Sequence, residues 1–218
     1  MKTNSELQRK ILAELDWDPR LDASQVGVAC SSEGVVTLTG HVGTYADRIS
    51  AEQLTWHIGG VKAVANDLEV KLSAASRRTD TDVAGAAVRA LEWDVAVPHE
   101  QIKVTVTDGW VALAGEVEWQ FQRAAAEQAI RQLVGVRGVG NQIMLKPRVT
   151  ADDVKGRIEA AFKRNAELEA RRVQVDVQDR RVVLRGKVHS WAERQEAERA
   201  AWAAPGVAHV EDNLAIGV

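Results

Sequence analysis

Side chains that could perform catalysis or bind a metal ion are present in this chain, but their spacing fits neither task. The single cysteine, Cys30, cannot form a disulfide within the chain, and its place in an alternating apolar run indicates a small packed side chain. No serine or cysteine stands with a histidine in a pattern that indicates a nucleophile and its base. The sequence therefore predicts a protein that is not an enzyme and has no cofactor and no metal site. Five histidines show no separation typical of zinc ligands: His41, His57, His99, His189 and His209.

The stretch "GVRGVGN" at residues 135–141 is rich in glycine, as loops that bind phosphate often are. Such a loop follows a strand and leads into a helix. Here the order is reversed, because the stretch follows a predicted helix and enters a predicted strand. A phosphate-binding loop is therefore excluded.

Arginine recurs at one place in three similar stretches, as Arg48, Arg123 and Arg194, and a glutamate follows each arginine four residues later. Residues four apart are neighbours on a helix, so a surface ion pair of a few tenths of a kcal/mol is the favoured interpretation. Arginine before glutamate is the weaker orientation of such a pair. A contact from these arginines to a phosphate group or to a neighbouring repeat is the alternative. The glutamates are Glu52, Glu127 and Glu198.

Tryptophan is over-represented among the aromatic residues, with seven copies against one tyrosine and two phenylalanines. Core packing is the favoured interpretation for most of them, including the matching pairs Trp17 with Trp93 and Trp56 with Trp202. Trp110 and Trp119 are predicted to be exposed, the first because it points away from Val111. Exposed indoles suit a membrane interface or a protein contact.

The arginines and most of the tryptophans lie in a sequence pattern that occurs three times along the chain. Gly40, Gly115 and Gly186 can be set in register at spacings of 75 and 71 residues. A unit of about 70 residues buries only roughly 60% of its unfolded surface, so each repeat is expected to be marginally stable alone. Contacts between the repeats are therefore expected to matter.

Each repeat opens with a predicted helix whose apolar residues recur every four positions. Possible capping boxes precede these helices at Thr3 with Glu6, Thr79 with Asp82, and Thr150 with Asp153. Two alternating strands follow, joined by a tight turn that is clearest at Asp108-Gly109, where asparagine should also be tolerated. The helical stripes are Leu7, Ile11 and Leu15; Val83, Ala87 and Leu91; Val154, Ile158 and Phe162.

Glycine ends the second strand at Gly40, Gly115 and Gly186, which indicates a backbone angle or a close approach that a Cβ atom would hinder. A second helix follows, and glycine past its end is a common terminator. The small residues Ala51, Ala126 and Ala197 indicate that this helix approaches the sheet closely. The same face is expected to continue through Leu54 and Ile58, Ala129 and Leu133, and Ala200 and Ala204. The terminating glycines are Gly60, Gly135 and Gly206.

The predicted fold class is α+β, with three tandem αββαβ sandwiches at residues 3–71, 79–146 and 150–217. Each has a three-stranded mixed sheet with both helices on one face. The last two strands of each repeat should be parallel, because a crossover helix joins them.

This pattern resembles the BON domain, named for bacterial osmotic-stress and nodulation proteins. The resemblance rests on "GVVTLTGHV", "GWVALAGEV" and "RVVLRGKV", followed by "GGVKAVANDLEV", "VGVRGVGNQIML" and "PGVAHVEDNLAI". It implies non-enzymatic modules that associate with phospholipid membranes and envelope proteins, mostly outside the cytoplasm.

The charge and hydropathy of the chain limit the classes of partner that it is expected to bind. The chain has a net charge of -3, and none of the repeats has the basic excess of a nucleic-acid binder. No apolar run is long enough to cross a bilayer, and the N-terminus lacks the apolar core of a signal peptide. As written, the chain is therefore expected to be cytoplasmic and to have no transmembrane segment and no nucleic-acid partner.

The sequence thus predicts a tandem BON-like binding or scaffold module at phospholipid or envelope surfaces, with a role in stress response. The alternative is a soluble cytoplasmic sensor that binds a small ligand or cation at domain junctions. Assembly into a homo-oligomer stays open.

Overall fold

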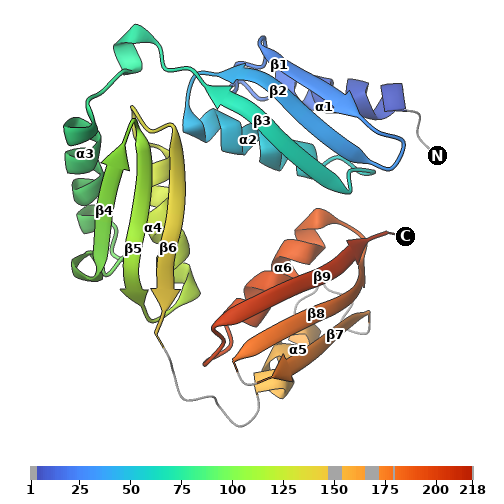
Figure 1. Ribbon diagram of the computed structural model, residues 1–218. Coiled ribbons are helices and arrows are strands. Elements are labelled where there is room, and N and C mark those ends of the chain that lie inside the picture. The colour runs from blue at the N-terminus through green and yellow to red at the C-terminus, as the bar shows by residue number, and fades with distance from the viewer. Residues whose placement is uncertain (1–3, 147–153, 165–171, 179, 218) are drawn as a thin grey trace. The chain divides into compact units, whose positions relative to one another are not determined.

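The computed structural model describes residues 4–146, 154–164, 172–178 and 180–217. Figure 1 shows the same succession of helix, two strands, helix and strand three times along the chain. Each repeat has its own three-stranded sheet, with the hairpin strands antiparallel and a third strand added after the second helix. The predicted fold class is confirmed.

The first repeat begins with a helix of 14 residues, and its central strand pairs antiparallel with the strand before it and parallel with the strand after it. The parallel pairing was predicted from the crossover helix. The elements are α1 (Asn4–Trp17), β1 (Val26–Cys30), β2 (Val35–Val42), α2 (Tyr45–Trp56) and β3 (Ala63–Val70).

The second and third repeats follow the same order, with two short 3₁₀ helices in addition, at Ala74–Ser76 and His99–Gln101. The second consists of α3 (Asp80–Trp93), β4 (Ile102–Thr107), β5 (Trp110–Val117), α4 (Gln120–Arg131) and β6 (Gly138–Leu145). The third consists of α5 (Val154–Arg164), β7 (Val173–Gln178), β8 (Arg181–Val188), α6 (Trp191–Trp202) and β9 (His209–Ile216).

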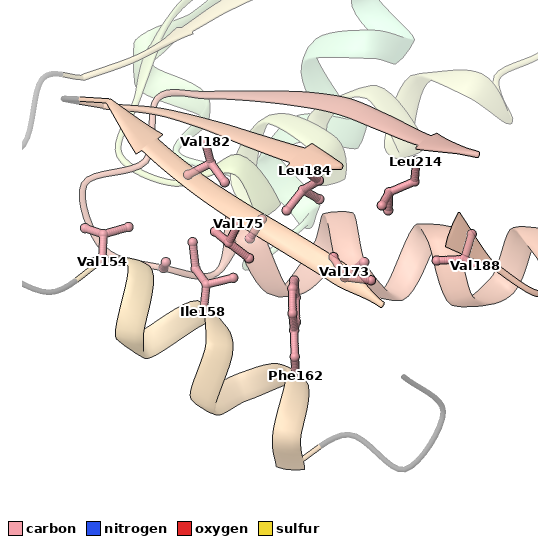
Figure 2. Close-up of a cluster of buried hydrophobic side chains, with 12 residues drawn as sticks. Val154, Ile158, Phe162, Val173, Val175, Val182, Leu184, Val188 and Leu214 are labelled. Atoms are coloured by element: carbon pink, nitrogen blue, oxygen red, sulfur yellow. The ribbon is translucent and has the colours of Figure 1, made fainter. Parts of the chain in front are cut away.

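The core of each repeat lies between its helices and one face of its sheet. All nine residues of the predicted stripes on the first helices are buried. Figure 2 shows the third repeat, where Ile158 and Phe162 project from α5 toward Val175 and Leu184 of the sheet. The four-residue periodicity in the sequence therefore identified these buried faces correctly.

The second helices bury a face slightly different from the predicted one. Ala51, Ala126 and Ala197 are fully buried as expected. The next buried position is four residues further, at Thr55, Ile130 and Ala201, whereas the predicted Leu54, Ala129 and Ala200 are only half-buried. Of the predicted residues further along, Ala204 is buried, and Ile58 and Leu133 are half-buried. The Thr55 hydroxyl can occupy the core because it donates a 2.8 Å hydrogen bond to the Ala51 carbonyl.

The repeated glycine at the end of the second strand occupies a site that a larger residue cannot use. Gly40, Gly115 and Gly186 have φ angles of +106°, +145° and +130°. A Cβ atom at each would lie 2.0 Å from a backbone carbonyl oxygen just before the first strand of the same repeat. Both the left-handed backbone and the lack of space thus require glycine.

The α3 capping box is present, with Thr79 Oγ1 accepting from the Asp82 N–H at 3.2 Å and the Asp82 carboxylate accepting from the Thr79 N–H at 3.3 Å. The predicted caps at Thr3 and at Thr150 with Asp153 lie outside the described residues.

At the β4–β5 turn, Asp108 and Gly109 have φ angles of +52° and +76°. These signs fit the two-residue turn predicted for this hairpin.

Candidate functional site

The arginine and glutamate of α2 meet at one residue of β3, Asn66. The Asn66 side-chain amide donates hydrogen bonds to the Arg48 carbonyl at 3.2 Å and to Glu52 Oε2 at 2.9 Å. Arg48 Nη2 donates in return to the Asn66 carbonyl at 2.9 Å, and Asn66 Oδ1 accepts from the Leu68 N–H. The asparagine thereby ties the second helix to the third strand.

The second repeat has the same arrangement with Asn141 on β6. Its amide donates to the Arg123 carbonyl at 3.0 Å and to Glu127 Oε2 at 3.1 Å, and its Oδ1 accepts from the Ile143 N–H. Arg123 Nη2 donates to the Asn141 carbonyl at 3.4 Å. Repetition of every contact in two repeats indicates that the cluster belongs to the fold.

The third repeat has Asp212 at this position. A carboxylate cannot donate to the helix carbonyl or to a glutamate, and it binds the arginine directly, with Arg194 Nε 2.5 Å from Asp212 Oδ2. Asp212 Oδ1 accepts from the Leu214 N–H as the asparagines do. The three arginines therefore have partners inside their own repeats, which gives their recurrence a structural reason.

We predict that Asn141→Leu destabilises the protein by about 1–3 kcal/mol, because the substitution leaves partly buried hydrogen-bonding groups of α4 and β6 without their partner. Gln142→Leu is the matched control, since this neighbouring amide side chain is exposed and should change the unfolding free energy by less than about 0.5 kcal/mol. Urea unfolding of both variants measures the difference. Equal losses would show that the asparagine contributes no special stability.

Two tryptophans predicted to fill the core are instead among the most exposed large hydrophobic residues that the structure describes. Trp17 and Trp93 have exposed fractions of 84% and 86%, at the same place in the first and second repeats. Each lies two residues after the last buried leucine of its helix, Leu15 or Leu91. Two residues turn about 200° around an α-helix, so the indole must point away from the core.

The two indoles predicted to be exposed have different environments. Trp110 is 55% exposed on the outer face of β5. Its ring covers Gly138 of β6, where an added Cβ would lie 2.2 Å from a ring carbon. Trp119 is half-buried. Of the two, Trp110 therefore presents the larger apolar surface to solvent.

A family model describes nearly the whole chain. The BON domain matches three times, at residues 3–71, 79–147 and 150–217. The chain belongs to the BON domain family. The BON repeats are 29% identical over 147 residues to the osmotically-inducible protein Y of Escherichia coli (strain K12), an alignment covering 66% of this chain and 73% of the relative.

The BON repeats also align with a solved structure, the C-terminal domain of CdsD, a structural protein of the type III secretion system of Chlamydia trachomatis. The alignment covers 100% of both chains at 13% identity, with a TM-score of 0.27. A second CdsD structure aligns over 97% of this chain and 92% of its own at 14% identity, with the same TM-score. At these scores the likeness carries no argument about fold or function.

Acidic side chains surround the exposed indoles of the first two BON repeats. Asp16 and Asp18 flank Trp17, and Glu92 and Asp94 flank Trp93. Hydrogen bonds from the side chain and backbone of Arg20 lower the pKa of the Asp18 carboxyl from 3.8 to about 2. This carboxylate is therefore ionised at neutral pH, and neither helix end forms a basic patch.

The remaining reactive side chains form no recognisable centre. The Cys30 thiol is half-buried at the end of β1, and burial raises its pKa. Across the described residues, no three histidine, cysteine, aspartate or glutamate side chains come together as metal ligands would. Among the residues that the structure describes, no helix of the BON chain has the length and apolar character needed to span a membrane.

Proposed function

We propose that this BON-domain protein is a non-enzymatic binding module that attaches to phospholipid surfaces through Trp17 and Trp93. The observation that supports it is the exposure of these equivalent indoles, at 84% and 86%. A tryptophan pointing away from the core contributes little to folding, yet two repeats carry one at the same position. Indole rings favour the boundary between water and lipid, where the apolar body is buried and the N–H stays hydrated.

The positions of the indoles determine which tryptophans we propose as the lipid contacts. Trp110 begins β5 beside the turn whose N–H groups bind Asp80, the first residue of α3. Trp93 is the last residue of α3, so the two indoles lie at opposite ends of the second repeat (Figure 1). Trp110 also lies on the sheet face opposite the buried Val111, whereas Trp93 points from α3 away from the core, so one flat surface cannot engage both. Trp17 and Trp93 therefore replace Trp110 and Trp119 as the primary contacts.

The strength of such attachment depends on using both indoles. Burial of one large apolar side chain contributes about 1.5–3 kcal/mol, which alone gives weak binding. Joining two contacts in one chain makes the second contact intramolecular and raises the overall affinity. The third repeat has Arg164 in place of the tryptophan, so we assign the contact to the first two repeats.

The acidic residues beside Trp17 and Trp93 determine the expected lipid preference. Basic clusters gain roughly 1 kcal/mol per lysine or arginine near an anionic surface. Asp18 is paired with Arg20, but the carboxylates of Asp16, Glu92 and Asp94 next to an inserted indole should have the opposite effect. Attachment should therefore be at least as strong on zwitterionic as on anionic vesicles, and it should respond only modestly to salt.

The test is co-sedimentation of the full chain with phosphatidylcholine vesicles, with and without phosphatidylserine, at low and high salt. We predict that Trp17→Ala/Trp93→Ala lowers the vesicle affinity by about tenfold or more. Trp110→Ala is the matched control, and its affinity should stay within about twofold of the wild type. Wild-type affinity in the double variant, or binding restricted to anionic vesicles and removed by salt, would refute this mechanism. Failure of the wild type to bind any vesicle would refute the proposed lipid attachment itself.

The relative in Escherichia coli is named as osmotically inducible. That name supports placing the proposed attachment in the response to osmotic stress. Comparing the growth of strains with and without the gene after an osmotic upshift tests this assignment, and equal growth would count against it.

A further inference from the structure

The outer face of α3 differs from that of the corresponding helices. The first repeat carries three long polar side chains next to the buried stripe, in "QRK" at residues 8–10, and the third repeat has Lys155 and Arg157 on either side of Gly156. The second repeat has Ala84, Gly85 and Ala86 there. Glycine inside a helix costs about 1 kcal/mol relative to alanine. Gly85 has a counterpart in Gly156 of the third repeat, so it is the flanking Ala84 and Ala86 that give the second repeat its smooth helix surface.

This surface is the floor of a shallow open groove. Its lining includes Asp82, Gly85, Ala86 and Arg89 of α3, with Val134 from the segment between α4 and β6. Val134 is 53% exposed. A Cβ atom at Gly85 would meet the Arg89 guanidinium at 3.4 Å and no backbone atom outside the helix within 4 Å. A second helix could therefore approach the α3 backbone closely at Gly85.

Charges along this groove alternate in a self-complementary order. Arg78, just before the Thr79 cap, also lines the groove. Asp82, Arg89 and Glu92 lie with Gly85 on one stripe of α3 at spacings of three, four and three residues. In sequence order the charges read positive, negative, positive and negative. The pairs Arg78 with Glu92 and Asp82 with Arg89 are both centred on Gly85 and Ala86.

We infer that the occupant of this groove is α3 of a second copy of the chain, packed antiparallel about a twofold axis at Gly85 and Ala86. The twofold axis places Arg78 of one copy opposite Glu92 of the other, and Asp82 opposite Arg89. A parallel arrangement would instead place like charges opposite one another. Isologous pairing of one patch with itself is the commonest way in which soluble proteins form dimers.

The expected dimer is weak. One pair of α3 helices, each 14 residues long, should bury less than the roughly 1,200 Å² of a standard stable interface. Small residues at the crossing point allow close packing of the helices but add little apolar area. We therefore expect half-dimerisation on the order of 10–100 µM, which corresponds to a transient association.

The experiment is analytical ultracentrifugation of the full chain from about 1 to 300 µM, a range that spans the expected dissociation constant. The weight-average mass should rise with concentration from the monomer value of 23.8 kDa toward twice that value. Gly85→Leu should remain monomeric, because its side chain fills the crossing point. Circular dichroism checks that this variant is folded, as expected since leucine favours helix.

A charge exchange tests the proposed geometry independently of Gly85. Arg78→Glu and Glu92→Arg should each weaken dimerisation by about tenfold, and combining them should restore it. Asp16→Arg, at the position in α1 that corresponds to Glu92, should leave dimerisation unchanged. A monomer throughout the concentration range, or a dimer indifferent to Gly85→Leu and to the exchange, would overturn the inference.

Discussion

Gly115→Ala should destabilise the second BON repeat by about 3 kcal/mol or more, because two separate constraints require glycine there. Its φ angle of +145° is one that other residues rarely adopt. An added Cβ would also lie 2.0 Å from the Gln101 carbonyl oxygen and 3.1 Å from its carbon. Both atoms belong to the backbone, so the start of β4 would have to move away from β5.

Gly140→Ala is the control, because a Cβ atom at Gly140 would have no heavy atom within 4 Å. That variant should change the unfolding free energy by less than about 0.5 kcal/mol. Urea unfolding followed by circular dichroism compares the two alanine variants directly. Equal midpoints would show that β4 and β5 separate without cost, and the explanation given for the repeated glycine would be wrong.

The topology could be predicted from the sequence because it depends on local patterns that occur three times. The four-residue stripe of α3 and the alternation in β5 each identify a buried face, and Asp108-Gly109 identifies the turn between β4 and β5. A helix between two strands then implies that those strands are parallel. All of these features depend on residues close together in the sequence, which explains why they could be recognised.

Contacts between residues far apart in the sequence were harder to predict. Glu52 was predicted to pair with Arg48 four residues earlier, but its hydrogen-bond partner is Asn66, 14 residues later. An asparagine at matching positions in the first two repeats was the available signal.

The residues tolerated in the Asp108-Gly109 turn also depend on a distant contact, because a Cβ at Gly109 would lie 2.8 Å from the Gly135 carbonyl oxygen. Asparagine at Gly109 is therefore less tolerable than the turn type alone suggested.

The exposed tryptophans show where residue type was given too much weight. Trp17 and Trp93 were assigned to the core together with most of the tryptophans. Their angular position relative to Leu15 and Leu91 already placed them on the solvent side. Thr55 is the opposite case, since it is a polar residue that is fully buried, with its hydroxyl donating to the Ala51 carbonyl. In both cases the helical position was the better guide.

Replacement of Phe162 by alanine should have the other large effect, a loss of about 3–5 kcal/mol. Phe162 is 1% exposed and packs in the core of the third repeat, where it points from α5 toward the sheet (Figure 2). The cavity left by its ring would lie among valine and leucine side chains held by three strands. The second phenylalanine, Phe121, provides the same substitution on a surface, because it is 58% exposed. Phe121→Ala should therefore cost less than about 1 kcal/mol.

The sequence suggested that contacts between repeats matter, but the core around Phe162 consists only of residues of the third repeat, so the consequence of Phe162→Ala should be confined to that repeat. A domain of about 70 residues has little stability to spare, so a loss of this size would leave the third repeat largely unfolded while the first two stay native. Hydrogen exchange should then show lost protection in β7, β8 and β9, with protection kept in β2 and β5. Loss of protection in all three sheets would mean that the repeats stabilise one another strongly. Full protection in the third sheet would show that this core tolerates the cavity, contrary to the prediction.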